Sequence, residues 1–176
     1  MILLAIETSC DETAVCIVKR ARGKSVRFEV LSHKVLSQVD LHKQYGGVFP
    51  ALAKREHSRA LTQLIVECLV EADLLTERTH EYHIPNDKRK KLELLLAKEP
   101  DMLKAMKVMF EGIQKPAVDA IAVTQGPGLE PALWVGINGA LALRLLWEVP
   151  VYPINHMEGH IITGALSVSN AIYEVT

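Results

Sequence analysis

The sequence is poor in aromatic residues and carries almost no net charge. Aromatic side chains make up 5% of the 176 residues, which does not favour a surface that stacks single-stranded bases. Lys and Arg number 20 against 21 Asp and Glu, and the net charge of −1 excludes a polycation that coats nucleic acid by charge alone. Hydrophobic residues at 49% and charged residues at 23% are typical of a packed globular chain; they exclude a disordered tail, a collagen and a low-complexity linker.

Cysteine pairs and long hydrophobic runs are also missing. The sequence has three cysteines, Cys10, Cys16 and Cys68. This odd count without a C-x-x-C predicts neither a disulfide framework nor a cysteine-rich zinc site, so we expect buried free thiols in a reducing compartment. The first apolar run stops at Glu7 with no basic residues before it, and the longest stops at Arg144, too short to span a bilayer. We therefore expect a soluble, cytoplasmic protein without a signal peptide.

The order of apolar runs and helical repeats predicts an α/β fold with a mixed sheet flanked by helices. Three β segments open the chain and are expected to form a meander, followed by a long helix, a strand, a helix, a strand and a final helix. The expected strands are 2–6, 14–18, 26–35, 118–123 and 151–154, and the expected helices are 49–73, 131–147 and one that begins within 155–160.

Residues 75–116 differ from the rest of the chain and are predicted to form an inserted helical hairpin. Their charge density is higher, and two short amphipathic patterns are separated by Pro100. The apolar faces are rich in Leu and Met, and we expect them to pack back onto the parent domain. The basic run Lys88–Lys91 favours a solvated helix face, with an RNA contact as the alternative.

Two histidines four residues apart, His156 and His160, form the first candidate site. On a helix they lie on one face, where two imidazoles can share one metal ion. Glu158 lies about 200° around the helix from His156 and cannot serve as the base of a zincin-type site. Two ligands are too few for a stable site, so from spacing alone a pair of surface histidines stays the alternative. The remaining histidines are interpreted as surface or capping residues: His33, His42, His57, His80 and His83.

Two turns have the composition of an anion or cation site. The acidic turn after the first strand contains Glu7, Asp11 and Glu12 among small hydroxyl residues; it could hold a phosphate or a magnesium ion, or be a polar turn with local caps. The loop 126–128 lies between a predicted strand and a helix, where exposed N–H groups favour anions. It lacks both the P-loop and the dinucleotide-binding glycine patterns, so a tight strand-to-helix turn is the alternative.

Four motifs occur in a fixed order along the chain. They are Ile6-Glu-Thr-Ser-Cys-Asp-Glu-Thr13, His42-x-x-Tyr45-Gly-Gly-Val-x-Pro50-x-Leu-Ala-x-Arg55-x-His57, Gly126-Pro-Gly-Leu129 and Asn155-His-Met-Glu-Gly-His160. Together they closely resemble the TsaD family, the tRNA adenosine threonylcarbamoyltransferases. The resemblance covers residues 1–74 and 117–166, and it implies an amino-terminal lobe of the actin, hexokinase and Hsp70 (ASKHA) fold. That lobe would comprise 1–74 and 117–176, with 75–116 as the insertion.

The family resemblance also implies a reaction, a metal and partners. The reaction would transfer threonylcarbamoyl from threonylcarbamoyl-adenylate to N6 of the adenosine 3′ of the anticodon in tRNA. His156 and His160 match the family's metal-binding pair, and the third ligand, an aspartate, is expected beyond the end of this chain; such a set suits one divalent iron or zinc ion. Asp11 and Glu12 match acidic residues that face the family's cleft and are the candidate catalytic residues. TsaB-like and TsaE-like proteins are the implied partners, and a homodimer through the amino-terminal lobe is a further implied assembly.

Departures from the family pattern keep other functions open. Family members are much longer, so we expect this chain to be the first half of an enzyme, to bind metal poorly and to transfer nothing unaided. A non-catalytic TsaB-like scaffold that dimerises with the transferase is the alternative, although that relative lacks the metal pair. A sugar or acetate kinase of the same superfold is a third interpretation. A charge at Leu64 should weaken dimerisation, or unfold the protein if Leu64 belongs to the core.

Overall fold

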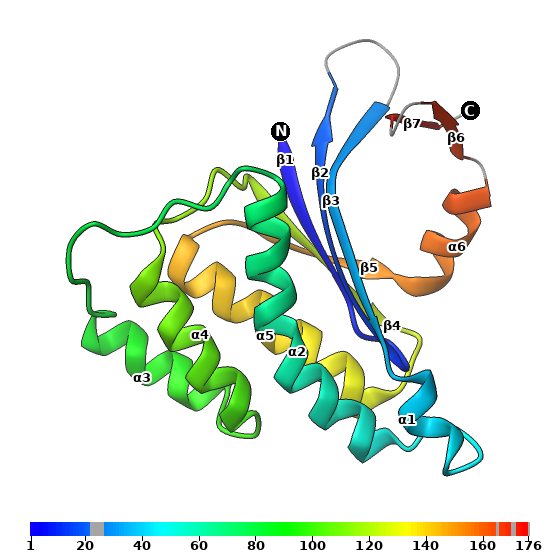
Figure 1. Cartoon of the computed structure of the whole chain (residues 1–176), viewed down its shortest axis with the longest axis horizontal. Helices are drawn as coiled ribbons and strands as arrows, with labels where there is room; N and C mark the ends of the chain where they lie inside the picture. The colour runs from blue at the N-terminus through cyan, green and yellow to red at the C-terminus, as the bar shows by residue number, and fades with distance from the viewer. Residues whose placement is uncertain (22–26, 165, 170–171, 176) are drawn as a thin grey trace.

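The computed structural model describes residues 1–21, 27–164, 166–169 and 172–175, and its strands form a mixed sheet (Figure 1). The strands are β1 (Ile2–Glu7), β2 (Glu12–Arg20), β3 (Arg27–Ser37), β4 (Ala120–Gly126), β5 (Val151–Asn155), β6 (Leu166–Ser169) and β7 (Ile172–Val175). The helices are α1 (Val39–Lys43), α2 (Pro50–Glu71), α3 (Asn86–Leu95), α4 (Pro100–Gly112), α5 (Glu130–Trp147) and α6 (His156–Gly164).

The observed elements confirm the predicted α/β class. Each predicted strand and helix is present to within a few residues, and Val26, the predicted start of the third strand, lies outside the described residues. Among the described elements, α1, β6 and β7 have no counterpart in the prediction. No helix in the described part of the chain combines the length and apolarity that crossing a bilayer requires.

β1 lies inside the sheet, whose strand order is β5-β4-β1-β2-β3-β7-β6. β2 pairs antiparallel with β1 and β3, which confirms the predicted meander, whereas β4 pairs parallel with β1 and β5. The carboxyl ends of these three parallel strands therefore meet at one edge of the sheet, where ligands bind in open α/β folds. Glu7, Gly126 and Asn155 are the last residues of β1, β4 and β5.

Helices α2 and α5 pack against the sheet and against each other, on the side to the left of the strands in Figure 1. Their apolar faces and alternate residues of the strands form one core, as the period of two in each strand requires. Side chains buried in this core include Leu4, Ile17, Leu61, Ile65, Ile121 and Leu143. Leu64 is 7% exposed and belongs to the same core, so a charge there is expected to unfold the protein rather than probe a dimer surface.

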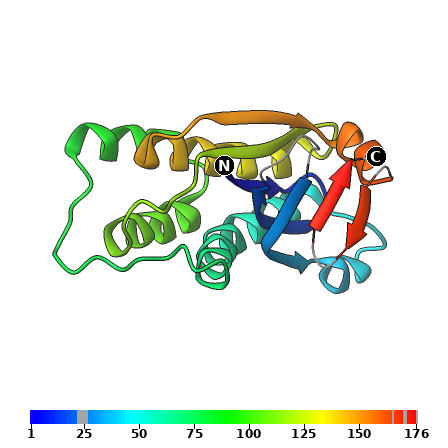
Figure 2. The same ribbon diagram turned by 90° about the horizontal axis from the view of Figure 1, so that it is seen from above.

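The predicted insertion, residues 75–116, adds its own apolar side chains to this core. Met102 and Met106 of α4 are fully buried, and Phe110 is 3% exposed. The Phe110 ring meets Trp147 of α5 edge to face, with centroids 6.0 Å apart. The predicted packing onto the parent domain is therefore confirmed. Figure 2 shows α3 and α4 (green) at the opposite end of the molecule from β6 and β7 (red).

A buried carboxylate, Glu99, connects the start of α4 to helices α2 and α5. The Glu99 side chain is 2% exposed and forms an ion pair with Lys54 of α2 at 3.0 Å. It also accepts a hydrogen bond from the amide of Asn138 of α5 at 3.4 Å. A buried charge is tolerated only when it is paired in this way, so Glu99 links three helices at one point.

The basic run of the insertion is partly neutralised within the chain. Lys88 lies 2.5 Å from a carboxylate oxygen of Glu148, and Arg89 lies 3.0 Å from Glu111. These pairs join α3 to the end of α5 and to α4. Lys88 and Arg89 are half-buried, whereas Lys90 and Lys91 are exposed, so the predicted solvated face is confirmed only for Lys90 and Lys91.

Candidate metal centre

The two candidate metal ligands face each other at the start of α6. His156 follows β5 directly, and His160 lies about one helical turn later. Their Nε2 atoms are 2.9 Å apart, and their rings meet edge to face with centroids 4.5 Å apart. The predicted shared helix face is therefore confirmed. Two imidazole nitrogens that converge on one point fit a single metal ion, whose bonds to histidine nitrogen are about 2.0–2.1 Å long.

Glu7 and Ser9, from the turn after β1, lie on the other side of the His156 ring. Nδ1 of His156 is 3.4 Å from Oε2 of Glu7 and 3.4 Å from Oγ of Ser9. Almost the whole chain separates these residues from His156, and the parallel pairing of β1, β4 and β5 brings them together. The acidic-turn pattern contains Glu7 but does not connect it to the histidines, because spacing along the chain carries no information on strand order.

The carboxylate side chain of Glu7 is partly buried. Burial disfavours its charged form, but hydrogen bonds from Ser9, Thr124 and His156 outweigh burial and hold the pKa of Glu7 below its ordinary value of 4.5. Glu7 also lines a cavity of about 350 Å³ on the sheet, together with Thr124 and Ile154. The site therefore has a negatively charged carboxylate, Glu7, beside His156, and the same carboxylate borders a cavity.

The glycine-rich loop after β4 packs against the acidic turn. A Cβ atom on Gly128 would lie 2.7 Å from the carbonyl oxygen of Ser9, so this close approach requires glycine. The N–H of Leu129 donates to the same carbonyl at 2.7 Å, and the Thr8 hydroxyl donates to the carbonyl of Ala132 at 2.9 Å. The loop is therefore a tight strand-to-helix turn, and the N–H of Leu129 at its end is hydrogen-bonded to the acidic turn.

Asp11 and Glu12 occupy the same turn, whereas the contacts of His156 run to Glu7 and Ser9. Asp11 is half-buried, and Glu12 is exposed at the start of β2. Their role in a substrate cleft stays a prediction. The described residues contain no group of three or more His, Cys, Asp or Glu side chains that could hold a metal ion.

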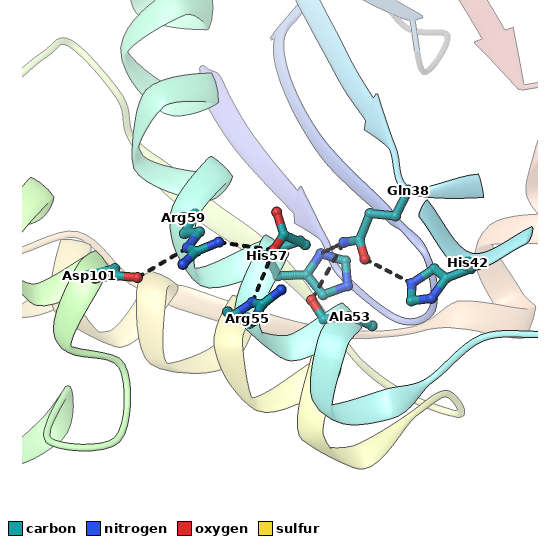
Figure 3. Close-up of polar contacts among 8 residues, drawn as sticks. Gln38, His42, Ala53, Arg55, His57, Arg59 and Asp101 are labelled. Carbon is teal, nitrogen blue, oxygen red and sulfur yellow. Dashed lines mark hydrogen bonds and ion pairs between the residues drawn. The ribbon is translucent and has the colours of Figure 1, made fainter. Parts of the chain in front are cut away.

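Two of the histidines interpreted as surface or capping residues are buried, so that interpretation is wrong for His42 and His57. His57 is fully buried and His42 is 3% exposed. Figure 3 shows the amide of Gln38 between the two rings, where it replaces the water that a surface histidine would contact. The other three histidines are exposed, as predicted: His33, His80 and His83.

The partners of His57 determine where its proton lies. Nε2 donates to the carbonyl oxygen of Cys10 at 3.1 Å, because a carbonyl only accepts. Nδ1 then accepts from the hydroxyl of Thr13 at 2.7 Å and from the amide of Gln38 at 3.2 Å. The amide oxygen of Gln38 accepts from Nε2 of His42 at 3.1 Å (Figure 3). This network joins the acidic turn to α1 and α2 and requires a neutral His57.

The stability of the fold is expected to fall as the pH drops below the ordinary histidine range. Burial lowers the pKa of His57 from its ordinary value of 6.5, and the Cys10 carbonyl and the charges of Glu7 and Asp11 only partly offset this, while His42 adds to the lowering. The unfolded chain then binds the proton more readily than the folded chain. This stabilisation is therefore complete above pH 6.5 and is lost as the pH falls toward the folded-state pKa.

Urea unfolding of the wild type and His57→Gln, between about pH 7.5 and about pH 5, measures this dependence. We expect the difference in unfolding free energy between the two proteins to shrink as the pH falls, since the carboxylates titrate in both. A difference that stays constant over this range would contradict a neutral, buried His57.

The three cysteines are free, as predicted, but they are not all buried. Cys68 is buried and Cys16 is half-buried, and burial raises the pKa of the Cys16 thiol to about 11. Cys10 is exposed in the turn between β1 and β2. The expectation of buried thiols is therefore wrong for Cys10.

Comparison with known proteins identifies the family of this chain. The model of the TsaD family, described as tRNA N6-adenosine threonylcarbamoyltransferase, matches residues 29–80 and 101–173. This chain belongs to the TsaD family. The stretch 81–100 between the two matched ranges lies inside the predicted insertion and contains α3.

Individual relatives are similar to this chain over only part of their own length. A tRNA N6-adenosine threonylcarbamoyltransferase from Thermomicrobium roseum is 39% identical over 168 residues, which cover 96% of this chain and 34% of that protein. The protein of the same name from Staphylococcus aureus is 36% identical over 161 residues, covering 92% of this chain and 34% of that protein. The chain thus spans about a third of the length of these curated relatives, not the expected half.

Two solved structures align with this chain at low sequence identity. YeaZ from Pseudomonas aeruginosa aligns with a TM-score of 0.47 and 15% identity over 99% of this chain and 64% of that chain. RuvC from Thermus thermophilus aligns with a TM-score of 0.41 and 12% identity over 93% of this chain and 68% of that chain.

Proposed function

We propose that this chain is part of a tRNA-modifying enzyme that transfers threonylcarbamoyl from threonylcarbamoyl-adenylate to N6 of the adenosine 3′ of the anticodon. Membership of the TsaD family supports this class of reaction. The observation that carries the proposal is the convergence of Nε2 of His156 and Nε2 of His160 at the carboxyl edge of the parallel strands. The amine nucleophile belongs to the tRNA, so this chain's role is to bind and orient the substrates.

In this proposal His156 and His160 supply two ligands to one divalent iron or zinc ion. Such an ion, when bound, polarises a carbonyl or phosphate oxygen of the substrate as a Lewis acid. Asp11 and Glu12 face the substrate from the turn that also contains Glu7. A carboxylate in that position can accept the proton that the adenosine amine loses during transfer.

The proposed partners follow from the reaction. They are tRNA, threonylcarbamoyl-adenylate and TsaB-like and TsaE-like proteins, with a homodimer through the amino-terminal lobe as a further assembly. The cytoplasm is the proposed location because mature tRNA is modified there. The proposed third metal ligand is an aspartate supplied from outside this chain.

Depletion of the protein in its host tests the proposal. Threonylcarbamoyladenosine should disappear from digested tRNA, as measured by liquid chromatography and mass spectrometry, and a plasmid copy should restore it. An unchanged nucleoside level after depletion would contradict the proposal. Full restoration by a copy that lacks both His156 and His160 would instead favour the non-catalytic scaffold.

A further inference from the structure

A row of hydrogen bonds joins Glu7, His156 and His160 and assigns a proton to each imidazole. A carboxylate only accepts hydrogen bonds, so neutral His156 carries its proton on Nδ1, which faces Oε2 of Glu7 at 3.4 Å. Nε2 of His156 is then bare and accepts from Nε2 of His160 at 2.9 Å. The bare nitrogen is the one that points to the place where both histidines converge.

The carboxylate of Glu7 is held in one orientation. Its Oε1 accepts from the backbone N–H of Ser9 at 2.5 Å, and the Ser9 carbonyl is fixed by the N–H of Leu129 at 2.7 Å. The Thr124 side chain also forms a hydrogen bond with Glu7. Oε2 is therefore the oxygen turned toward His156. Both side chains are about a third exposed or less, and partial shielding from water strengthens a bond to a charged acceptor.

We propose that Glu7 is a positioning residue that selects Nε2 of His156 as the metal-binding atom. Metal-bound histidines almost always donate their other N–H to a carboxylate, a carbonyl or water, which fixes the tautomer and the ring orientation. Glu7 stands in this relation to His156 in the structure, with Oε2 facing Nδ1. The inference rests on the proposed metal pair, but it concerns a residue outside that pair.

Replacing Glu7 by glutamine reverses the polarity at one atom. In Glu7→Gln the Ser9 N–H still requires an oxygen at the Oε1 position, so the amide NH₂ takes the Oε2 position and faces Nδ1 of His156. Because NH₂ donates, the imidazole proton moves to Nε2 and blocks the metal-binding atom. Glu7→Ala leaves Nδ1 facing the Ser9 hydroxyl at 3.4 Å, which can donate or accept and so imposes no tautomer. The expected order of metal affinity is wild type, then alanine, then glutamine, whereas a purely structural role would make alanine the weakest.

The first measurement is the tautomer of His156 in the metal-free chain, by ¹⁵N NMR of the imidazole at about pH 8, above the ordinary histidine pKa. We expect Nδ1–H in the wild type and Nε2–H in Glu7→Gln. The second measurement is the Zn²⁺ affinity of the complete transferase, which supplies the third ligand, by calorimetry; Glu7→Gln should lower this affinity by about 10- to 100-fold. Glu158→Gln, which removes an exposed carboxylate from the same helix, is the matched control and should change neither result.

Two outcomes would overturn the inference: an Nε2–H tautomer in the wild type, or a folded Glu7→Gln that binds Zn²⁺ as tightly as the wild type. Circular dichroism verifies that each variant is folded. If the complete wild-type transferase, with its third ligand, binds no Zn²⁺ while the tautomer switches as expected, the metal pair of the proposed function fails and the orientation of His156 by Glu7 stands.

Discussion

Replacing His156 by alanine in the complete transferase is expected to remove the bound metal and to lower threonylcarbamoyl transfer by at least about 100-fold. A Lewis-acid metal contributes several kcal/mol to a transition state, and each 1.36 kcal/mol is about tenfold in rate. The fold should survive, because the His156 side chain is 28% exposed and lies outside the apolar core. Substitutions at such positions usually change stability by less than about 1 kcal/mol.

Elemental analysis of the purified variant and mass spectrometry of the modified nucleoside check the two parts of this result. His83→Ala is the matched control, since it removes an imidazole that is 70% exposed in the insertion, far from α6 in the fold (Figure 1). Both metal content and transfer should be unchanged in the control. Full transfer by the His156 variant would show that the metal assignment is wrong.

Replacing Phe110 by alanine is expected to lower the free energy of unfolding of the whole chain by about 3–5 kcal/mol. Phe110 is 3% exposed and packs on Trp147, so the substitution removes a large ring from the junction between the insertion and α5. A domain of this kind is stable by only about 5–15 kcal/mol, so the loss is a large fraction of the total.

Urea unfolding followed by tryptophan fluorescence and by circular dichroism measures this effect, since Trp147 reports directly on the junction. Val108→Ala is the matched control: Val108 is also on α4 but is 67% exposed, and its loss should change the unfolding free energy by less than about 0.5 kcal/mol. Coincident transitions are expected for both probes. If the insertion melted separately and left the lobe intact, it would be an independent unit rather than part of the core.

Local patterns predicted most of the fold because their physical causes are local. The apolar run at Ile2–Glu7 and the helical repeat at Pro50–Glu71 each reflect burial of one face, which period alone reveals. The packing of the insertion was predictable for the same reason, because Met102, Met106 and Phe110 recur at helical spacing. The four ordered motifs identified the family independently of any contact in the structure.

The histidines show what local sequence patterns can and cannot predict. The i, i+4 spacing of His156 and His160 predicts that they share a helix face, since both belong to one element. His57 lies four residues after Ala53 and four before Leu61, so the helical period of α2 places it on the buried face, a signal that the surface interpretation overlooked. Its partners Thr13 and Gln38 come from other segments, so the sequence does not show which groups satisfy a buried imidazole.

The sequence by itself determined the α/β class, the family and the pair of histidines. The tertiary structure alone decided that Glu7, rather than Asp11 or Glu12, lies against His156, and that the loop at Gly128 packs closely on the acidic turn. The reason is that these contacts depend on the order and direction of strands in the sheet. Strand order follows from the packing of the whole chain, whereas motif and period are properties of each segment alone.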